Sequence, residues 1–233
     1  MTARAAISVV VPVLDEERRV TELLRHLEAV LPGAERIVVD GGSRDDTCRR
    51  VEDAGGARLV RAARGRAVQL NAGAAVARGD VLLFLHADVR LPADAGEWMS
   101  RALADPGVVA GAFRTWTVAD GPSRPPWAPL LHLADLRSRY TRRPYGDQGL
   151  FVRARVFHEV GGYPSQALME DYELSRRLGR VGNVRIVPAR VQVSGRRFLA
   201  RPWFFTAVVN LFPVLYRLGV PPEALARLYA NVR

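Results

Sequence analysis

The chain has 233 residues, a length that suits one large α/β domain or at most two small ones. Hydrophobic residues make up 48% and charged residues 25%, so disordered, collagen-like and coiled-coil proteins are excluded. The net charge is +10 and the chain has no lysine. The excess of arginine could serve binding to nucleic acid, a membrane surface or phosphate ligands. It is equally explained by the composition of an arginine-rich proteome.

Cys48 is the single cysteine, which excludes an intramolecular disulfide and a cysteine-based zinc site. A reducing cytoplasm is the expected location. The apolar runs 5–14 and 203–216 are shorter than the roughly 20 residues of a membrane-spanning helix, and no cleavage site follows the first. We therefore expect a soluble cytoplasmic protein, or one bound peripherally at the inner face of the membrane.

The first half of the chain alternates between short apolar runs and amphipathic segments. The apolar runs predict strands at 7–13, 36–39, 58–61 and 81–85. The segments between and after them predict helices over about 20–31, 43–54 and 67–78, and another that opens at Pro92. This alternation predicts an α/β fold: a Rossmann-like, mostly parallel sheet with helices on both faces.

The second half is less regular. A long strand is expected at 108–118, then a proline-rich loop at 119–129 and a strand at 148–152. After these come predicted helices at 153–160 and 170–180, two short strands at 184–187 and 191–194, and a helical tail. We find no repeat and no linker, so a single domain is expected.

Acidic residues lie at the ends of three predicted strands and at the start of one predicted helix. They are Asp15, Asp40, Asp88 and the pair Glu170-Asp171. Ligands gather beyond the carboxyl ends of parallel strands, although a single aspartate there is usually a helix cap. Carboxylates crowded at one edge repel unless a cation or hydrogen-bond donors lie among them. A divalent cation with phosphate oxygens would satisfy them, and Arg64 and Arg66 add positive charge before a helix.

Five strings in a fixed order carry a resemblance to a known family. They are VVVPVLDEE, VVDGGSRDDT, RGRAVQLNAGAAVARGDVLLFLHADVRLP, GDQGLFVRARVFHEVGGYP and LMEDYEL. Together they resemble an inverting family 2 glycosyltransferase of the GT-A fold over roughly 6–180. The HAD, GDQ and RRF strings are similar to the soluble radical-SAM/selenodomain-associated, arsenosugar-biosynthesis-type subgroup.

The resemblance implies one GT-A domain over 1–233. Within it, 6–118 would be the nucleotide-sugar half, 119–200 the acceptor and catalytic half, and 201–233 a helical tail. The residues that match the family's nucleotide site are Pro12, Asp15, Glu16, Asp40, Arg66, Asn71, Gly73 and Ala87. Among them, Asp40 would accept the imide N–H of the base, a contact that suits uracil or guanine over adenine.

The resemblance also implies the chemistry. Asp88 would hold Mg²⁺ or Mn²⁺ on the donor diphosphate, and Asp171, beside Glu170, would be the catalytic base. Inversion at the anomeric carbon is one displacement, in which a carboxylate takes the acceptor proton as the nucleoside diphosphate leaves. The metal neutralises the leaving charge, so no general acid is needed.

Three features leave alternatives open. His86 stands where the family has the first aspartate of its Asp-x-Asp motif, and it is either a ligand to metal or hydroxyl or an ordinary satisfied histidine. The family's Gln-x-x-Arg-Trp motif is missing; Arg196 and Arg197 lie near its position, as a diphosphate clamp or as solvated charge. Asp147 and Gln148 either face the acceptor or cap a loop.

The expected partners are a nucleoside-diphosphate sugar and a hydroxyl-bearing acceptor. The rival enzyme, a sugar-1-phosphate nucleotidyltransferase, would open with a glycine-rich phosphate loop and use lysines. A basic nucleic-acid-binding protein is the non-enzymatic rival, but the arginines are scattered, so no nucleic acid is expected. No G-x-G-x-x-G follows the first strand, which counts against a dinucleotide oxidoreductase.

Residues 203–216 are apolar on nearly every side, so a helix there is expected to bury two faces. One face would pack on the domain. The second would contact another copy of the chain or the membrane surface, unless the helix is buried internally on both.

Overall fold

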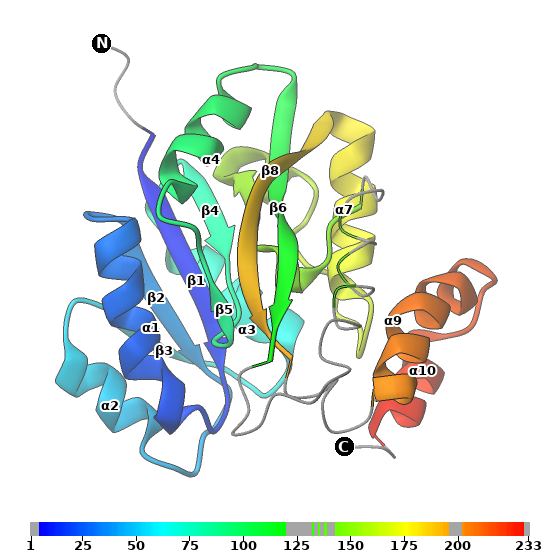
Figure 1. The fold of residues 1–233 in the computed structure, drawn as a ribbon, viewed down its shortest axis with the longest axis horizontal. Coiled ribbons are helices and arrows are strands. Elements are labelled where there is room, and N and C mark those ends of the chain that lie inside the picture. Colours follow the sequence, from blue (N-terminus) through cyan, green and yellow to red (C-terminus); the bar gives the residue numbers. More distant parts are fainter. Residues whose placement is uncertain are drawn as a thin grey trace.

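The computed structural model describes residues 5–119, 132, 135, 138, 143–195 and 202–230, except the side chains of 202–207, 209 and 230. Its first half is the predicted alternation of strands and helices (Figure 1). The strands are β1 (Ile7–Val13), β2 (Glu35–Asp40), β3 (Arg58–Arg61) and β4 (Val81–Phe84). The helices are α1 (Glu17–Val30), α2 (Thr47–Ala54), α3 (Arg66–Val76) and α4 (Ala95–Leu103).

The sheet has eight strands within the described residues, in the order β3-β2-β1-β4-β7-β6-β8-β5. The other four strands are β5 (Val89–Arg90), β6 (Val108–Val118), β7 (Leu150–Arg153) and β8 (Asn183–Ser194). β1 pairs in parallel with β2 and β4, and β6 pairs in parallel with β8, whereas β7 is antiparallel to both neighbours. The expected mostly parallel sheet is therefore confirmed, as a mixed sheet that curls back through β5.

Two expectations for the second half need correction, and one strand had not been expected. The predicted strand at 148–152 begins only at Leu150, because Gly146–Gln148 forms the short 3₁₀ helix η2. The two predicted strands at 184–194 are one strand, β8. Its register against β6 slips between Ala112 and Arg114, and the irregularity accommodates Pro188, which could not donate to a regular ladder. β5 has only two residues, too few to give a sequence pattern.

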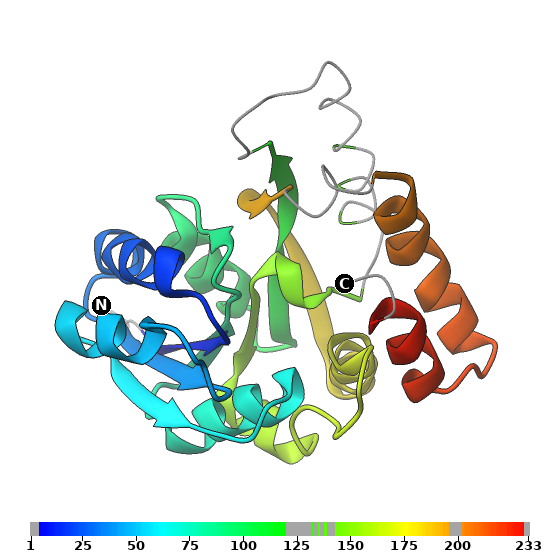
Figure 2. The same ribbon diagram turned by 90° about the horizontal axis from the view of Figure 1, so that it is seen from below.

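The sheet is buried on both faces because its central strands are apolar at successive positions. Val9, Val11 and Val13 of β1 belong to one core cluster, with side chains of α1 and α4. Val10 belongs to the opposite cluster, with side chains of α3, α7 and α6 (Ala154–Glu159). Figure 2 shows α1 on one side of the sheet and α3 and α7 (Glu170–Val181) on the other. Helices on both faces are thus confirmed.

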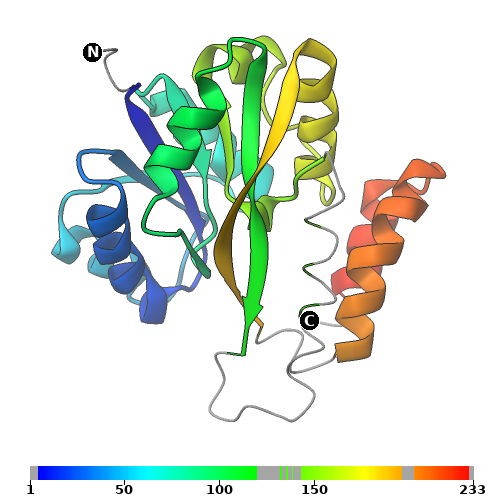
Figure 3. The same ribbon diagram turned by 45° about the horizontal axis from the view of Figure 1, so that its top comes forward.

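The tail forms two helices, α9 (Pro202–Arg217) and α10 (Pro222–Ala230), which lie together beside α7 (Figure 3). Val208 and Phe212 of α9 and Leu225 of α10 pack against Met169 and Tyr172. Two faces of 203–216 were expected to be buried. The face that contains Val208 and Phe212 is the one that packs on the domain.

Candidate active site

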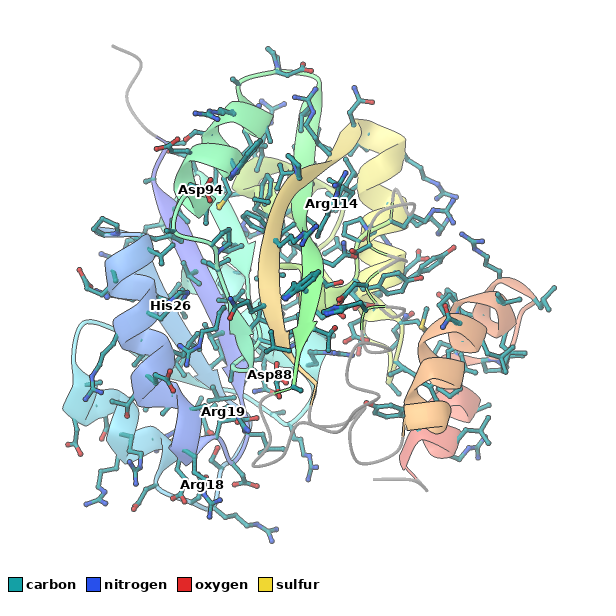
Figure 4. All side chains as sticks on the ribbon, viewed as in Figure 1. Arg18, Arg19, His26, Asp88, Asp94 and Arg114 are labelled. Carbon is teal, nitrogen blue, oxygen red and sulfur yellow. The ribbon has the colours of Figure 1, made fainter. Side chains whose placement is uncertain are left out.

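A cleft of about 1250 Å³ opens at the carboxyl ends of β1 and β4. Its described lining comes from 12–16, 64–69, 86–88, Tyr145, Asp147, 165–171, 193–194 and the tail residues Val208, Phe212, Pro213, Glu223 and Tyr229. Figure 4 shows Asp88 at this end of the sheet and Asp94 near the other. The volume exceeds the roughly 300–1,000 Å³ of most ligand pockets, so the cleft can hold a ligand of several linked groups.

Pro12, Asp15 and Glu16, which the resemblance assigned to the nucleotide site, form the first wall of the cleft. Asp15 has a left-handed backbone with φ 55°, a conformation that aspartate tolerates better than most residues. Its N–H donates to Ser43 Oγ at 2.9 Å, and its Oδ1 accepts the Arg44 N–H at 2.8 Å. These bonds hold the loop after β1 against the loop after β2.

Asp40 ends β2 and is only 4% exposed. Its carboxylate accepts the N–H groups of Gly42 and Ser43, each at 3.0 Å. Burial opposes ionisation, but these bonds and the Ser43 side chain hold the pKa of Asp40 below its ordinary value. Asp40 is not among the residues that line the cleft. Its contact with a base therefore stays a prediction, and its observed role is to order the 41–43 turn.

Of the three residues predicted on α3, only Arg66 lines the cleft. Asn71 lies deeper, where its Nδ2 donates to the Tyr163 carbonyl at 2.8 Å and its Oδ1 accepts the Tyr163 N–H at 2.9 Å. Gly73 lets α3 approach the sheet, because a Cβ there would collide with Val10 and Val39. Asn71 and Gly73 thus position the helix whose first turn faces the cleft.

Gln69 was missed in the sequence. It is 5% exposed, and its Nε2 donates to the carbonyls of Val13 at 2.9 Å and Val39 at 2.8 Å. One amide thereby joins the ends of two parallel strands beneath the cleft. The only available signal was a polar residue at a buried helical position.

His86, Ala87 and Asp88 follow β4 and all line the cleft. The Asp88 carbonyl accepts the Ser194 N–H at 3.2 Å, next to the pairing of β5 with β8. This contact brings the end of β8, more than a hundred residues away in sequence, to the same wall. Val193 and Ser194 join the site in this way.

Asp171 lines the cleft from the first turn of α7. Its Oδ2 accepts the Gly146 N–H at 2.6 Å, and its Oδ1 accepts the Tyr172 N–H at 2.8 Å. A Cβ on Gly146 would lie 2.7 Å from His86 Nε2 and 3.2 Å from Asp171 Oδ2. The absence of a side chain at Gly146 therefore lets the imidazole and the carboxylate approach each other across this loop.

Glu170 differs from its neighbour, since its side chain is only 2% exposed and its Oε1 forms an ion pair with Arg66 Nε. Its Oε2 has no hydrogen-bond partner among the residues that the structure describes. Beside the pair lies a small cavity of about 10 Å³, close to the room that one water needs. Burial raises the pKa of Glu170, an effect that Arg66 opposes and Asp171 reinforces. The pair joins α3 to α7 under the cleft.

Replacing Arg66 with methionine is expected to destabilise the fold more at pH 8 than at pH 4. Breaking a buried ion pair costs about 3–5 kcal/mol. Because the Arg66 side chain is 40% exposed, we expect about 2 kcal/mol. Without Arg66 the pKa of Glu170 in the folded protein rises further. The folded protein then keeps the Glu170 carboxyl protonated at pH values above about 4.3, where the unfolded chain has already lost this proton. The free energy of unfolding therefore falls as pH rises.

Urea unfolding of the wild type and the Arg66→Met variant from pH 4 to 8 measures this difference. The Arg66→Met/Glu170→Gln double variant is the control, because a neutral amide should remove the pH-dependent part of the loss. A loss that is the same at both ends of this pH range would show that Glu170 does not carry it.

The remaining predicted site residues differ in where they lie. Asp147 lines the cleft. Gln148 is 1% exposed, its Nε2 donates to the Phe113 carbonyl at 2.9 Å, and its Oε1 accepts the Tyr145 N–H at 3.0 Å, so it closes the loop. Arg196 and Arg197 lie outside the described residues.

Several lining residues had no sequence prediction. The stretch 165–169 and the aromatic residues Tyr145 and Tyr229 reach the cleft only through packing. Met169, with a left-handed φ of 66°, caps α7 and directs the chain into Glu170. No local pattern indicates a backbone turn of this kind at a methionine.

Asp88 and His86 could ligate a cation only together with further ligands, such as the phosphates of a bound substrate. Within the described part of the chain, no group of three His, Cys, Asp or Glu side chains could hold a metal ion. Mg²⁺ typically uses one or two protein carboxylates, with substrate phosphates and water completing its shell. The cleft therefore suits a divalent cation bound together with a diphosphate rather than a resident metal.

Residues 8–161, more than half of the chain, match the protein family described as Glycosyl transferase family 2. Two curated relatives are both named undecaprenyl-phosphate 4-deoxy-4-formamido-L-arabinose transferase. The one from Klebsiella pneumoniae subsp. pneumoniae is 26% identical over 97% of this chain and 71% of its own length. The one from Pseudomonas fluorescens is 32% identical over 64% of this chain, which spans 46% of that relative.

Solved structures are also similar. A mannosyltransferase from Pyrobaculum calidifontis in complex with GDP-Man and Mn²⁺ has a TM-score of 0.66 and 21% identity, covering 99% of this chain and 70% of its own. The glucosyl-3-phosphoglycerate synthase from Mycobacterium tuberculosis, in complex with Mn²⁺, UDP and glucosyl-3-phosphoglycerate, has a TM-score of 0.60 and 20% identity. It covers 81% of this chain and 71% of its own. At these identities the likeness concerns the fold. None of the described helices is long and apolar enough to cross a membrane.

Proposed function

Because the chain belongs to glycosyl transferase family 2, we propose that it moves a sugar from a UDP- or GDP-sugar to an acceptor hydroxyl with inversion at the anomeric carbon. The observation that carries this proposal is that Asp88, Asp171 and Arg66 in the first turn of α3 all line one cleft. Such a cleft offers a carboxylate for a proton and positive groups for a diphosphate.

In the proposed reaction the acceptor oxygen attacks the anomeric carbon while the bond to the nucleoside diphosphate breaks. Asp171 takes the acceptor proton; its carboxylate is held by the Gly146 and Tyr172 N–H groups, which fix its orientation. Arg66 and the first turn of α3 lie where negative charge on the leaving group is favoured. A bound Mg²⁺ or Mn²⁺, held by Asp88 and His86 with the phosphates, would neutralise part of that charge.

Glu170 has a different role in this proposal. Its ion pair with Arg66 and its burial keep it from the acceptor, so it positions Arg66 and the start of α7. Asp147 is another carboxylate that lines the cleft and is the alternative to Asp171 as the base. Pro12, Asp15, Glu16 and Ala87 are proposed to contact the nucleotide.

We assign the proposed functions to the ranges expected from the sequence. Residues 6–118 bind the donor, residues 119–200 bind the acceptor and contain the catalytic base, and residues 201–233 are the helical tail beside the cleft. The HAD, GDQ and RRF strings support the soluble radical-SAM/selenodomain-associated subgroup as the proposed place within the family. The family match favours sugar transfer over nucleotidyl transfer. The names of the curated relatives add undecaprenyl phosphate as a second acceptor class to test.

Thermal unfolding with a panel of nucleotide sugars tests the proposal. A UDP- or GDP-sugar should raise the melting temperature in the presence of Mn²⁺, because saturation at about 100 times Kd adds roughly 2.7 kcal/mol to the stability of the fold. An ADP-sugar is the control, since adenine lacks the imide N–H. The proposal fails if no UDP- or GDP-sugar stabilises the protein, or if the ADP-sugar stabilises it equally.

A further inference from the structure

The two helices of the tail expose apolar side chains. Of the six large hydrophobic residues that are exposed in the described part of the chain, four lie here. They are Leu211, Val214, Leu218 and Leu228, with exposed fractions of 50%, 48%, 77% and 54%, and we call them the tail surface. Leu211 and Val214 lie on one side of α9, next to the Val208 and Phe212 side that packs on α7, and Leu218 follows directly after the last residue of the helix.

The charge of this part of the sequence is unlike the rest. Residues 195–233 contain six arginines and a single glutamate, a net charge of +5, so this short stretch carries half of the whole chain's +10. The sequence of α9 contains no acidic residue. Arg217 and Arg227 are both exposed and directly precede Leu218 and Leu228 in the sequence, and Arg217 Nε also donates to the Tyr172 hydroxyl at 2.6 Å. Apolar and cationic side chains therefore occur together.

We propose that the tail surface docks on an anionic lipid bilayer. A helix that lies in the membrane interface places apolar side chains among the acyl chains and arginines among the headgroups. Each arginine near an anionic surface strengthens binding several-fold at physiological salt. Figures 2 and 3 show α9 and α10 at the edge of the molecule, away from the sheet, where a flat surface can reach them.

Charge also discriminates between a bilayer and a second copy of the chain. A two-fold dimer interface brings the same surface of both copies together. It would bring the exposed Arg217 and Arg227 of each copy toward those of the other, with Glu223 as the only acidic residue that the described tail offers to offset them, which opposes association. An anionic membrane reverses the sign of that interaction.

The position of the cleft gives this docking a consequence that rests on the proposed function. Val208, Phe212 and Pro213 of α9, and Glu223 and Tyr229 of α10, line the cleft. The same two helices thus face the cleft on one side and carry Leu211, Val214 and Leu228 of the tail surface on another. Docking would hold the mouth of the cleft beside the bilayer, within reach of an acceptor carried by a lipid.

Sedimentation of the full chain with vesicles, without any sugar donor, tests the docking. The protein should bind phosphatidylcholine vesicles that contain phosphatidylglycerol and leave pure phosphatidylcholine vesicles largely unbound, and high salt should weaken the binding. Leu218→Glu is expected to weaken binding about 10-fold or more, and Arg227→Gln several-fold. Because both positions are exposed, the variants should unfold at the wild-type temperature.

The matched controls lie at the far end of α7, where Val181 is 54% exposed and follows Arg180. Val181→Glu and Arg180→Gln should bind vesicles like the wild type. The affinity for UDP or GDP with Mn²⁺, measured by calorimetry, should be unchanged in all four variants, which separates docking from donor binding.

Three results would overturn the proposal. One is a wild type that ignores anionic vesicles, and another is a control variant that loses binding as strongly as Leu218→Glu. The third is a dimer in light scattering that Leu218→Glu dissociates, since the tail surface would then belong to a second copy. If Leu218→Glu fails to fold, Arg227→Gln and the salt dependence still decide.

Discussion

Asp171→Asn is expected to lower kcat by about 100-fold or more while leaving donor affinity unchanged. The asparagine keeps the shape, and its Oδ1 can still accept one of the N–H bonds from Gly146 and Tyr172, but it takes no proton from the acceptor. A hydroxyl nucleophile needs that proton removed as it attacks. Release of nucleoside diphosphate from the donor measures turnover, with water standing in for an unidentified acceptor.

Asp147→Asn is the matched comparison, because Asp147 is a second carboxylate on the wall of the same cleft. We expect it to retain more turnover than Asp171→Asn. Near-normal turnover in Asp171→Asn combined with a large loss in Asp147→Asn would move the base to Asp147. Glu170 is the weaker candidate, since it is buried and paired with Arg66.

Asp88→Ala is expected to remove the dependence of diphosphate binding on Mn²⁺. Loss of the one carboxylate that follows β4 leaves His86 as the only proposed protein ligand at this wall. Because Mg²⁺ and Mn²⁺ prefer hard oxygen ligands, we expect the affinity for UDP or GDP with Mn²⁺ to fall about 10–100-fold. Calorimetric titration with and without Mn²⁺ measures this loss directly.

Asp94→Ala controls for the loss of one negative charge, since Asp94 lies far from the cleft and its carboxylate accepts from Trp98 Nε1 at 2.7 Å (Figure 4). It should bind the diphosphate as the wild type does. A response to Mn²⁺ that survives in Asp88→Ala would mean that the cation is held elsewhere in the cleft.

The cleft's acidic and basic frame could be predicted from the sequence because it follows from local patterns. The apolar runs of β1 and β4 end at Asp15 and His86–Asp88, and parallel strands bring their ends to one edge. Arg66 opens α3 at that edge. The fold class and the residues of this wall thus depend on periodicity and on where each run stops.

The sequence does not distinguish the neighbours within each motif. Glu170 and Asp171 are adjacent and both border the cleft, yet the buried Glu170 is paired with Arg66, 104 residues away, whereas the carboxylate of Asp171 is held by the Gly146 N–H. Asp147 and Gln148 separate in the same way. Helical and loop geometry point consecutive side chains in different directions, and only packed neighbours decide which direction is buried.

What the tertiary structure alone decided are the contacts between distant segments. The antiparallel pairing of β5 with β8 curls the sheet and brings Ser194 to Asp88. The docking of α9 and α10 on α7 turns an evenly apolar segment into one side that is buried and another that is exposed. A sequence pattern records how apolar a residue is, whereas the surface that covers it depends on how segments far apart in the chain pack together.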